Sequence, residues 1–307
     1  MLRIAVCLAG LGIFVLAATM PDARAREPGI APVTPPGLTL GLPIAVSLPE
    51  GVYLTQRSSY YDATLYNPAG QKNGETASVF ANSSQITYVP GLMILGATYK
   101  AFILVPLVDE WIDRTTPASG RTGKYNQLDF ANPKIQPIDL SWNLGNGFNV
   151  STGVGVYVPL GQYTPGAAIN LGADFYTVEP SVGFTYLKDG WNASFQTVYD
   201  TNTRNNKLRY LSGDQIMFNA TVTKDFGGFN VGPVAYYQRQ ITGDVNDGGR
   251  TTFGGRTFSA PSNLAFGALV SHRVGSAIVT AYVTDDVAWH NTIGGVKGWL
   301  AVIFKLL

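Results

Sequence analysis

The sequence predicts an all-β fold, a transmembrane antiparallel β-barrel of about twelve strands with short periplasmic turns and long extracellular loops. Three observations predict it. From Gly51 onward, apolar residues alternate with polar or small ones at a period of two. Long and short connections follow one another without exception between the alternating segments. Charged residues make up only 13% of the 307 residues, against about 25% in ordinary globular domains.

The composition also excludes several classes of protein. Hydrophobic residues make up 46% of the chain, but most are scattered singly, which excludes a bundle of transmembrane helices. The 21 basic and 20 acidic residues form no basic surface for phosphates, so no nucleic-acid partner is expected. Aromatic residues, at 12%, are too frequent for a disordered chain.

Residues 1–25 predict a cleaved secretory signal peptide. An apolar stretch follows Arg3, and Ala23-Arg24-Ala25 places small residues where a signal peptidase reads them. We therefore expect cleavage after Ala25 and export to the outer membrane of a Gram-negative bacterium. The single Cys, Cys7, leaves with the signal, and the mature chain is neutral, with nineteen basic and nineteen acidic residues.

Residues 26–50 form a Pro-rich N-terminal segment. Six prolines in this range forbid a helix and disfavour a paired strand. We expect an extended segment that is a candidate plug for the barrel of residues 51–307.

The barrel strands follow from the alternation. In 148–158, for example, Phe148, Val150 and Thr152 alternate with polar or small residues. The predicted strands are 51–61, 78–89, 92–105, 135–143, 148–158, 175–187, 191–200, 214–224, 229–239, 263–273, 276–284 and 297–306. Residues 106–134 or 240–262 could add a further hairpin, which would make fourteen strands.

The connections have the chemistry of outer-membrane barrels. Short ones contain turn residues, as in Gly145-Asn146-Gly147 and Lys188-Asp189-Gly190. Aromatic residues such as Trp142 and Trp191 flank these turns, at the expected headgroup level of the outer-membrane lipid. Closure is required because lipid cannot hydrogen-bond a free sheet edge. The last strand, 297–306, resembles the C-terminal signal that the barrel-assembly machinery recognises.

The other face of the strands predicts a lumen lined by amides, hydroxyls and Tyr rings. Twelve strands enclose more space than an eight-stranded barrel and less than a sixteen-stranded porin, which favours a narrow or plugged passage. Sparse charge argues against strong ion selectivity. The predicted lumen-facing residues of a solute passage are Lys100, Asp139, Asn149, Tyr157, Glu179, Asn192, Gln196, Asp200, Asn219, Tyr236 and Gln238.

Enzymatic and metal sites find weaker support. His272 and His290 are the only imidazoles, and neither has a convincing Ser-based motif nearby; the acids close to His290 suit a solvated loop tip as well as a protease site. Residues 244–249 carry Asp244 and Asp247 but lack the bidentate Glu of a calcium loop, so a hydrophilic turn is preferred. We expect no catalytic residue, no metal ion and no cofactor.

Several short motifs, in their order, resemble a proteobacterial family named for the meta-pathway of phenol degradation. The resemblance covers 48–307 and includes Leu48-Pro49-Glu50-Gly51-Val52-Tyr53, Asn132-Pro133-Lys134-Ile135-Gln136-Pro137 and Tyr237-Gln238-Arg239-Gln240. It implies an outer-membrane barrel that passes small hydrophobic molecules, with no catalytic residue. Many relatives have a Gly-Asp pair where this chain has Phe130-Ala131-Asn132.

Two functions remain for the barrel. The first is an outer-membrane channel or transporter that admits small hydrophobic or aromatic compounds to the periplasm, which the neutral lumen and the resemblance favour. The alternative is a structural barrel whose long outer loops, 106–134 and 240–262, bind a partner or another surface.

Overall fold

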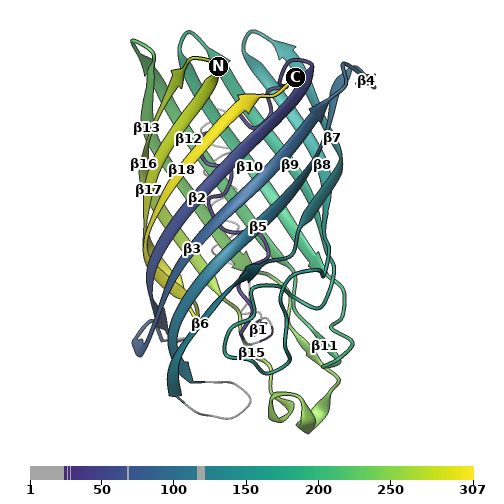
Figure 1. Cartoon of the computed structure of the whole chain (residues 1–307), viewed down its shortest axis with the longest axis vertical. Helices are drawn as coiled ribbons and strands as arrows, with labels where there is room; N and C mark the ends of the chain where they lie inside the picture. The colour runs from purple at the N-terminus through teal and green to yellow at the C-terminus, as the bar shows by residue number, and fades with distance from the viewer. Residues whose placement is uncertain (1–23, 26, 28, 68, 116–121) are drawn as a thin grey trace, which may run out of the picture.

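The computed structural model describes residues 24–307 apart from 26, 28, 68 and 116–121, and shows a closed barrel (Figure 1). The predicted signal peptide, 1–25, therefore lies almost wholly outside the described residues. Strand β18 pairs antiparallel with β2 and closes the sheet. The barrel strands are β2 (Gly51–Tyr66), β3 (Lys72–Val89), β5 (Ala97–Thr115), β7 (Lys134–Gly145), β8 (Phe148–Tyr157), β9 (Thr177–Lys188), β10 (Trp191–Asn202), β12 (Gln215–Phe226), β13 (Phe229–Gln240), β16 (Ser262–Val274), β17 (Ala277–His290) and β18 (Ile293–Lys305).

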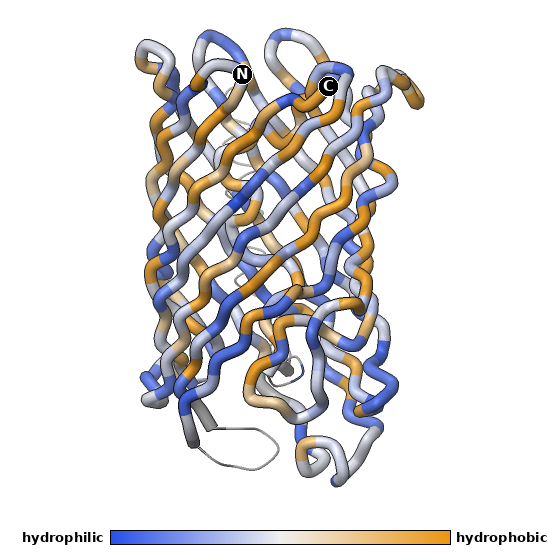
Figure 2. The backbone as a smooth tube through the Cα atoms, viewed as in Figure 1, coloured by the Kyte–Doolittle hydropathy of each residue, from blue (hydrophilic) through white to orange (hydrophobic). Residues whose placement is uncertain are grey.

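The predicted twelve-stranded barrel is confirmed, and its alternation has the expected physical basis. In β2 every second side chain from Tyr53 to Ala63 is buried inside the barrel. The opposite phase places apolar side chains such as Phe80, Ile103 and Val182 on the outer wall, with exposed fractions of 43%, 52% and 55%. Hydrophobic and hydrophilic residues accordingly alternate along the strands (Figure 2). This outer surface suits lipid, and the closed hydrogen-bond ladder leaves no strand edge in the hydrocarbon.

Several strands extend further at the loop end than the alternation predicts. Strand β3 begins at Lys72 instead of 78, β5 continues to Thr115 instead of 105, and β17 continues to His290 instead of 284. Beyond the membrane a strand has no lipid face, so its hydrogen bonds continue while the apolar alternation fades. A further hairpin does form within 106–134, where β6 (Thr122–Phe130) pairs with the end of β5, but it adds no strand to the barrel wall.

The predicted start of the third strand, at residue 92, is wrong. Residues 93–94 form the short strand β4 (Met93–Ile94), which turns back onto the start of β5. Leu95 and Gly96 both adopt positive φ, 49° and 77°, and this conformation ends the strand. The remaining small elements lie among the outer loops: β1 (Arg24–Ala25) pairs with β15 (Phe258–Ser259), β11 (Tyr210–Leu211) pairs with β14 (Val245–Asn246), and η1 (Gly249–Thr251) and η2 (Phe253–Gly255) are single 3₁₀ turns.

No helix in the described part of the chain is long and apolar enough to cross a membrane.

Residues 29–50 run inside the barrel, from the loop end to the start of β2 at the turn end (Figure 1). Instead of being fully extended, this inner segment, residues 29–50, folds into successive turns. Leu38 donates its backbone N–H to the Pro35 carbonyl at 3.2 Å, and Val46 donates to the Pro43 carbonyl at 2.9 Å. Proline has no N–H to donate but keeps its carbonyl as an acceptor, so it is well suited to begin such turns.

Candidate functional site

The candidate site is the lumen. All eleven predicted lumen residues lie in barrel strands, on the strand face that points into the lumen or at the end of that face. Six of them line one cavity near the turn end, and two line a second cavity near the loop end. Residues of the inner cavity are Lys100, Asp139, Tyr157, Glu179, Gln196 and Asn219, and those of the outer cavity are Tyr157 and Gln238. The other predicted residues, Asn149, Asn192, Asp200 and Tyr236, are buried elsewhere along the lumen.

The inner segment divides the lumen into these two cavities. The outer cavity has a volume of about 170 Å³ and is lined mostly by apolar groups, including Val33, Pro36 and Val108. The inner cavity has a volume of about 190 Å³ and lies against residues 42–48. Leu38, Leu104 and Tyr157 line both cavities and therefore lie between them.

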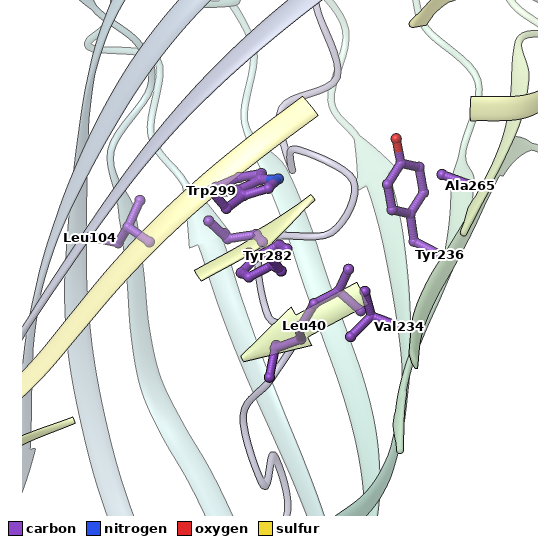
Figure 3. Packing of buried hydrophobic residues seen from close by; sticks show 9 residues of the cluster. Leu40, Leu104, Val234, Tyr236, Ala265, Tyr282 and Trp299 are labelled. Atoms are coloured by element: carbon purple, nitrogen blue, oxygen red, sulfur yellow. The ribbon is translucent and has the colours of Figure 1, made fainter. Parts of the chain in front are cut away.

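An apolar cluster fixes the middle of the inner segment against the barrel wall. Leu38 and Leu40 pack with Leu104 of β5 and with residues of β13 and β16 to β18 (Figure 3). In the same cluster the rings of Tyr282 and Trp299 stack with centroids 5.5 Å apart. The Tyr282 hydroxyl also donates to the Gly37 carbonyl at 2.9 Å. Apolar burial of this kind stabilises the docked position of the segment.

Polar contacts fix the same segment at other levels of the lumen. Thr39 donates its hydroxyl to Gln196 Oε1 at 2.5 Å, and the backbone N–H of Gly41 donates to Thr221 Oγ1 at 2.9 Å. Nearer the turn end, the Ala45 N–H donates to Thr185 Oγ1 at 3.0 Å. The bonds of Gly41 and Ala45 satisfy backbone N–H groups that lie outside any strand, as buried polar groups require.

Two buried acids meet the inner segment at Thr34. The Thr34 hydroxyl contacts Glu179, and it lies 3.1 Å from the Tyr157 hydroxyl and 3.4 Å from Asp200 Oδ1. Glu179 also forms an ion pair with Lys134. Of these residues, Glu179, Tyr157 and Asp200 were predicted lumen residues, and the structure brings all three to one point.

Asp286 organises a second polar group in the lumen. Tyr61 donates to its Oδ2 at 2.5 Å, and Tyr236 donates to its Oδ1 at 2.6 Å. The Lys297 ammonium lies 4.4 Å from the centroid of the Tyr61 ring and donates to the Pro36 carbonyl at 3.4 Å. The placement of Asp286 in a solvated loop tip is wrong, because β17 continues through this residue and turns it inward.

Replacing Asp286 with Ala is expected to destabilise the barrel by about 2 to 3 kcal/mol, because the Tyr61 and Tyr236 hydroxyls would lose their buried acceptor. Unfolding in urea, followed by heat-modifiable gel migration, measures the effect. Asp285→Ala is the matched control, since the neighbouring Asp285 faces outward and is exposed. Equal urea midpoints for the two variants would contradict the structural role of Asp286.

The outer loops hold the beginning of the described chain. Glu27 is buried, and its side chain accepts hydrogen bonds from the Tyr163 hydroxyl at 2.6 Å and from Asn205 Nδ2 at 2.9 Å. Its backbone N–H donates to the Ser212 hydroxyl oxygen at 3.1 Å. Burial raises the pKa of Glu27, and the bonds from Tyr163 and Asn205 oppose that rise. These contacts attach Glu27 to two outer loops. One precedes β9 and contains Tyr163, and the other follows β10 and contains Asn205 and Ser212.

In the candidate calcium loop, residues 244–249, the carboxylates of Asp244 and Asp247 bind other groups of the protein. Asp244 is buried, and its carboxylate accepts bonds from Tyr210, from the Gly213 N–H and from Gln240. Asp247 pairs with Arg204. The preferred prediction of a hydrophilic turn is therefore wrong for Asp244, which joins two outer loops.

The two imidazoles lie at opposite ends of neighbouring strands. His272, near the turn end of β16, stacks on Phe229 with ring centroids 4.2 Å apart and has its Nδ1 2.8 Å from the Gly228 carbonyl. His290 ends β17 on the loop side.

Comparison with known proteins places this barrel in a family. The family model described as "Putative MetA-pathway of phenol degradation" matches residues 61–302. The chain belongs to this family. Membership confirms the resemblance predicted from the motifs. No curated protein matches this member of the phenol-degradation family.

Comparison with solved structures finds one with the same architecture and others with a weaker likeness. The COG4313 outer membrane channel from Pseudomonas putida F1 has 13% sequence identity and a TM-score of 0.71, over 88% of this chain and 99% of that chain. The β domain of the Bordetella autotransporter BrkA has 14% identity and a TM-score of 0.47, over 84% of this chain and 100% of that one. A FadL homologue from Pseudomonas aeruginosa has 8% identity and a TM-score of 0.46, over 94% and 99%. The first likeness shows that this member of the phenol-degradation family shares the β-barrel fold of that channel.

Arg57 of β2 was not among the predicted passage residues, although it also lines the inner cavity. The two faces of this strand are similarly apolar, so the alternation alone does not give the phase of Arg57, and the charge of Arg57 is itself what favours the lumen. The residues around Arg57 depend on the register of the neighbouring strands.

Proposed function

We propose that this barrel is a channel that admits small hydrophobic or aromatic compounds to the periplasm. The observation that carries the proposal is the pair of largely apolar cavities separated by a thin layer of side chains around Leu38. An apolar cavity of about 150 Å³ in another protein binds benzene. Cavities of about 170 and 190 Å³ therefore each have room for a one-ring compound.

The family supports the proposal through its name, which refers to a pathway of phenol degradation. The named outer membrane channel from Pseudomonas putida supports the architecture that such a role needs. The lumen residues predicted from the sequence, together with Leu38 and Leu104, would form the passage, and the inner segment would act as a plug that moves aside. Cleavage of the signal after Ala25 would leave this segment free to enter the barrel.

Uptake by intact cells tests the proposal. A strain that lacks the chain is expected to take up labelled toluene several-fold more slowly than its parent, at concentrations where the outer membrane limits entry. A plasmid copy of the wild-type chain should restore the rate. Equal rates in deletion strain and parent, for toluene and for every other aromatic compound tested, would contradict a transport role.

The structural alternative predicts a different result from purified protein. If the barrel only presents its loops to a partner, correctly folded protein in planar bilayers should show no conductance and no solute flux. Heat-modifiable gel migration of the mature protein, with its N-terminus mapped near Arg26, establishes that the protein used is exported and folded.

A further inference from the structure

The inner cavity contains a buried cation whose neighbours are small. Arg57 lies in the middle of β2 and is only 4% exposed. Directly opposite it on the adjacent strands stand Ala301 of β18 and Ser83 of β3. Arg57 lines the inner cavity, and the two residues opposite it are small.

The charges that line the inner cavity leave Arg57 without a counter-ion. Lys100 pairs with Asp139 at 3.5 Å, and Lys134 pairs with Glu179. These two acids are the carboxylates in the lining, and both are already paired with lysines. Among the described residues, no carboxylate lies within ion-pair distance of Arg57.

Few of the hydrogen-bond donors of Arg57 are used. Its Nη1 donates to Gln85 Oε1 at 3.1 Å, and Gln85 in turn donates its Nε2 to Thr87 at 2.9 Å. A guanidinium has five N–H groups, and in the described part of the chain this bond to Gln85 is the only one they make. A buried guanidinium with no counter-ion and a single acceptor is costly, and a bound anion would offset that cost.

The rest of the cavity is suited to an apolar body. Leu42, Ile44, Phe102 and Ile303 contribute apolar surface to the lining of the same cavity. An inorganic anion would leave this surface uncovered, whereas an acid with one ring would cover it and fit the volume of about 190 Å³.

We propose that Arg57 makes the inner cavity a binding site for the carboxylate of a small apolar acid, such as a one-ring aromatic carboxylate. The inference rests on the proposed channel function, because it names a solute class for that passage. The carboxylate accepts two parallel hydrogen bonds from the guanidinium, and the ring lies against the apolar lining. A neutral compound of the same shape binds there without this charge-assisted pair.

Equilibrium dialysis of the full mature barrel in detergent tests the site, with benzoate and its neutral isostere benzamide as probes. Wild-type protein is expected to bind benzoate at least about tenfold more tightly than benzamide, because hydrogen bonds between charged groups are the stronger ones. Arg57→Met should reduce benzoate affinity to the level of benzamide and leave benzamide affinity unchanged. Arg57→Lys should retain most of the preference for benzoate.

Arg273→Met is the matched control, since this arginine is exposed at the turn end of β16 and should leave both affinities unchanged. Equal binding of benzoate and benzamide by wild-type protein would overturn the inference, even if Arg57→Met does not fold. Equal loss of both probes in folded Arg57→Met would also overturn it. Uptake of neutral toluene by cells is a separate readout: if toluene uptake depends on the chain and the benzoate preference is absent, only the carboxylate site fails.

Discussion

Deleting residues 29–46 is expected to convert the barrel into an open pore, with conductance at least about tenfold above that of the wild type. The expectation follows from what fills the lumen: residues 29–50 run through it, and Leu38 and Leu40 pack against the wall at its middle. Without the segment, a twelve-stranded barrel encloses more space than its own side chains fill. Single-channel recording in planar bilayers and liposome swelling with a small sugar measure the change.

The deletion should leave the barrel itself intact. Strands β18 and β2 pair from Ile293 to Lys305, and this closure makes no use of the inner segment. Apart from the apolar cluster around Leu38 and Leu40, many of the wall side chains that face the lumen are polar, so water can replace the segment against them. Leu40→Ala is the control: it keeps the segment, lines neither cavity and should change conductance little. A deletion variant that folds, migrates as a compact heat-sensitive form and conducts like the wild type would show that the segment does not obstruct the lumen.

The barrel could be predicted from sequence because one physical constraint acts on every strand. Lipid on one side and polar groups on the other impose a period of two from residue to residue, and short turns follow every second strand. The strand ends were less predictable. Beyond the membrane β5 continues to Thr115 through Asp109, Glu110 and Asp113, charged residues that the alternation treats as loop.

Which side chains of a strand face the lumen could also be predicted from the sequence. Thr280, Tyr282 and Thr284 share one face of β17, and continuing that phase leads to Asp286. The misplacement of Asp286 came from ending the strand at 284, not from misreading its face. The partners across the lumen could not be read in this way, because they depend on the stagger between strands and on the path of the inner segment.

The inner segment shows most clearly which contacts could not be predicted from the sequence. Its prolines exclude helix and strand but carry no period that indicates which wall each residue meets. Thr34 contacts Glu179 from β9, while Leu40 packs with residues from β13 and β17. Such contacts join residues more than a hundred positions apart and follow from the closed barrel, not from local sequence.

Fixing the turn-end part of the inner segment to the wall is expected to abolish solute entry through the barrel. Ala45 of the segment lies beside Gly183 of β9: a Cβ built on Gly183 would be 3.7 Å from the Ala45 Cβ. Disulfides have Cβ atoms about 3.8 Å apart. The double variant Ala45→Cys with Gly183→Cys should therefore form a bond in the oxidising periplasm. The only natural Cys, Cys7, lies in the proposed signal and would not compete.

The variant needs one accommodating change. The Ser151 hydroxyl would lie 2.5 Å from the new Cβ at position 183, so Ser151→Ala is added to remove the clash. Ile44 Cγ2, at 3.1 Å, needs to move only a few tenths of an ångström. Mass spectrometry of the intact protein establishes whether the bond has formed.

With the bond closed, toluene uptake by cells should fall to the rate of the deletion strain, and a reducing agent should restore it. The matched control carries Ser151→Ala and Gly183→Cys without the second cysteine and should respond to neither oxidant nor reductant. If the oxidised and reduced forms take up toluene equally, solutes pass around a stationary segment. Solutes would then pass Leu38 and Leu104 through side-chain motion alone, and the two cavities would be successive binding sites along the passage.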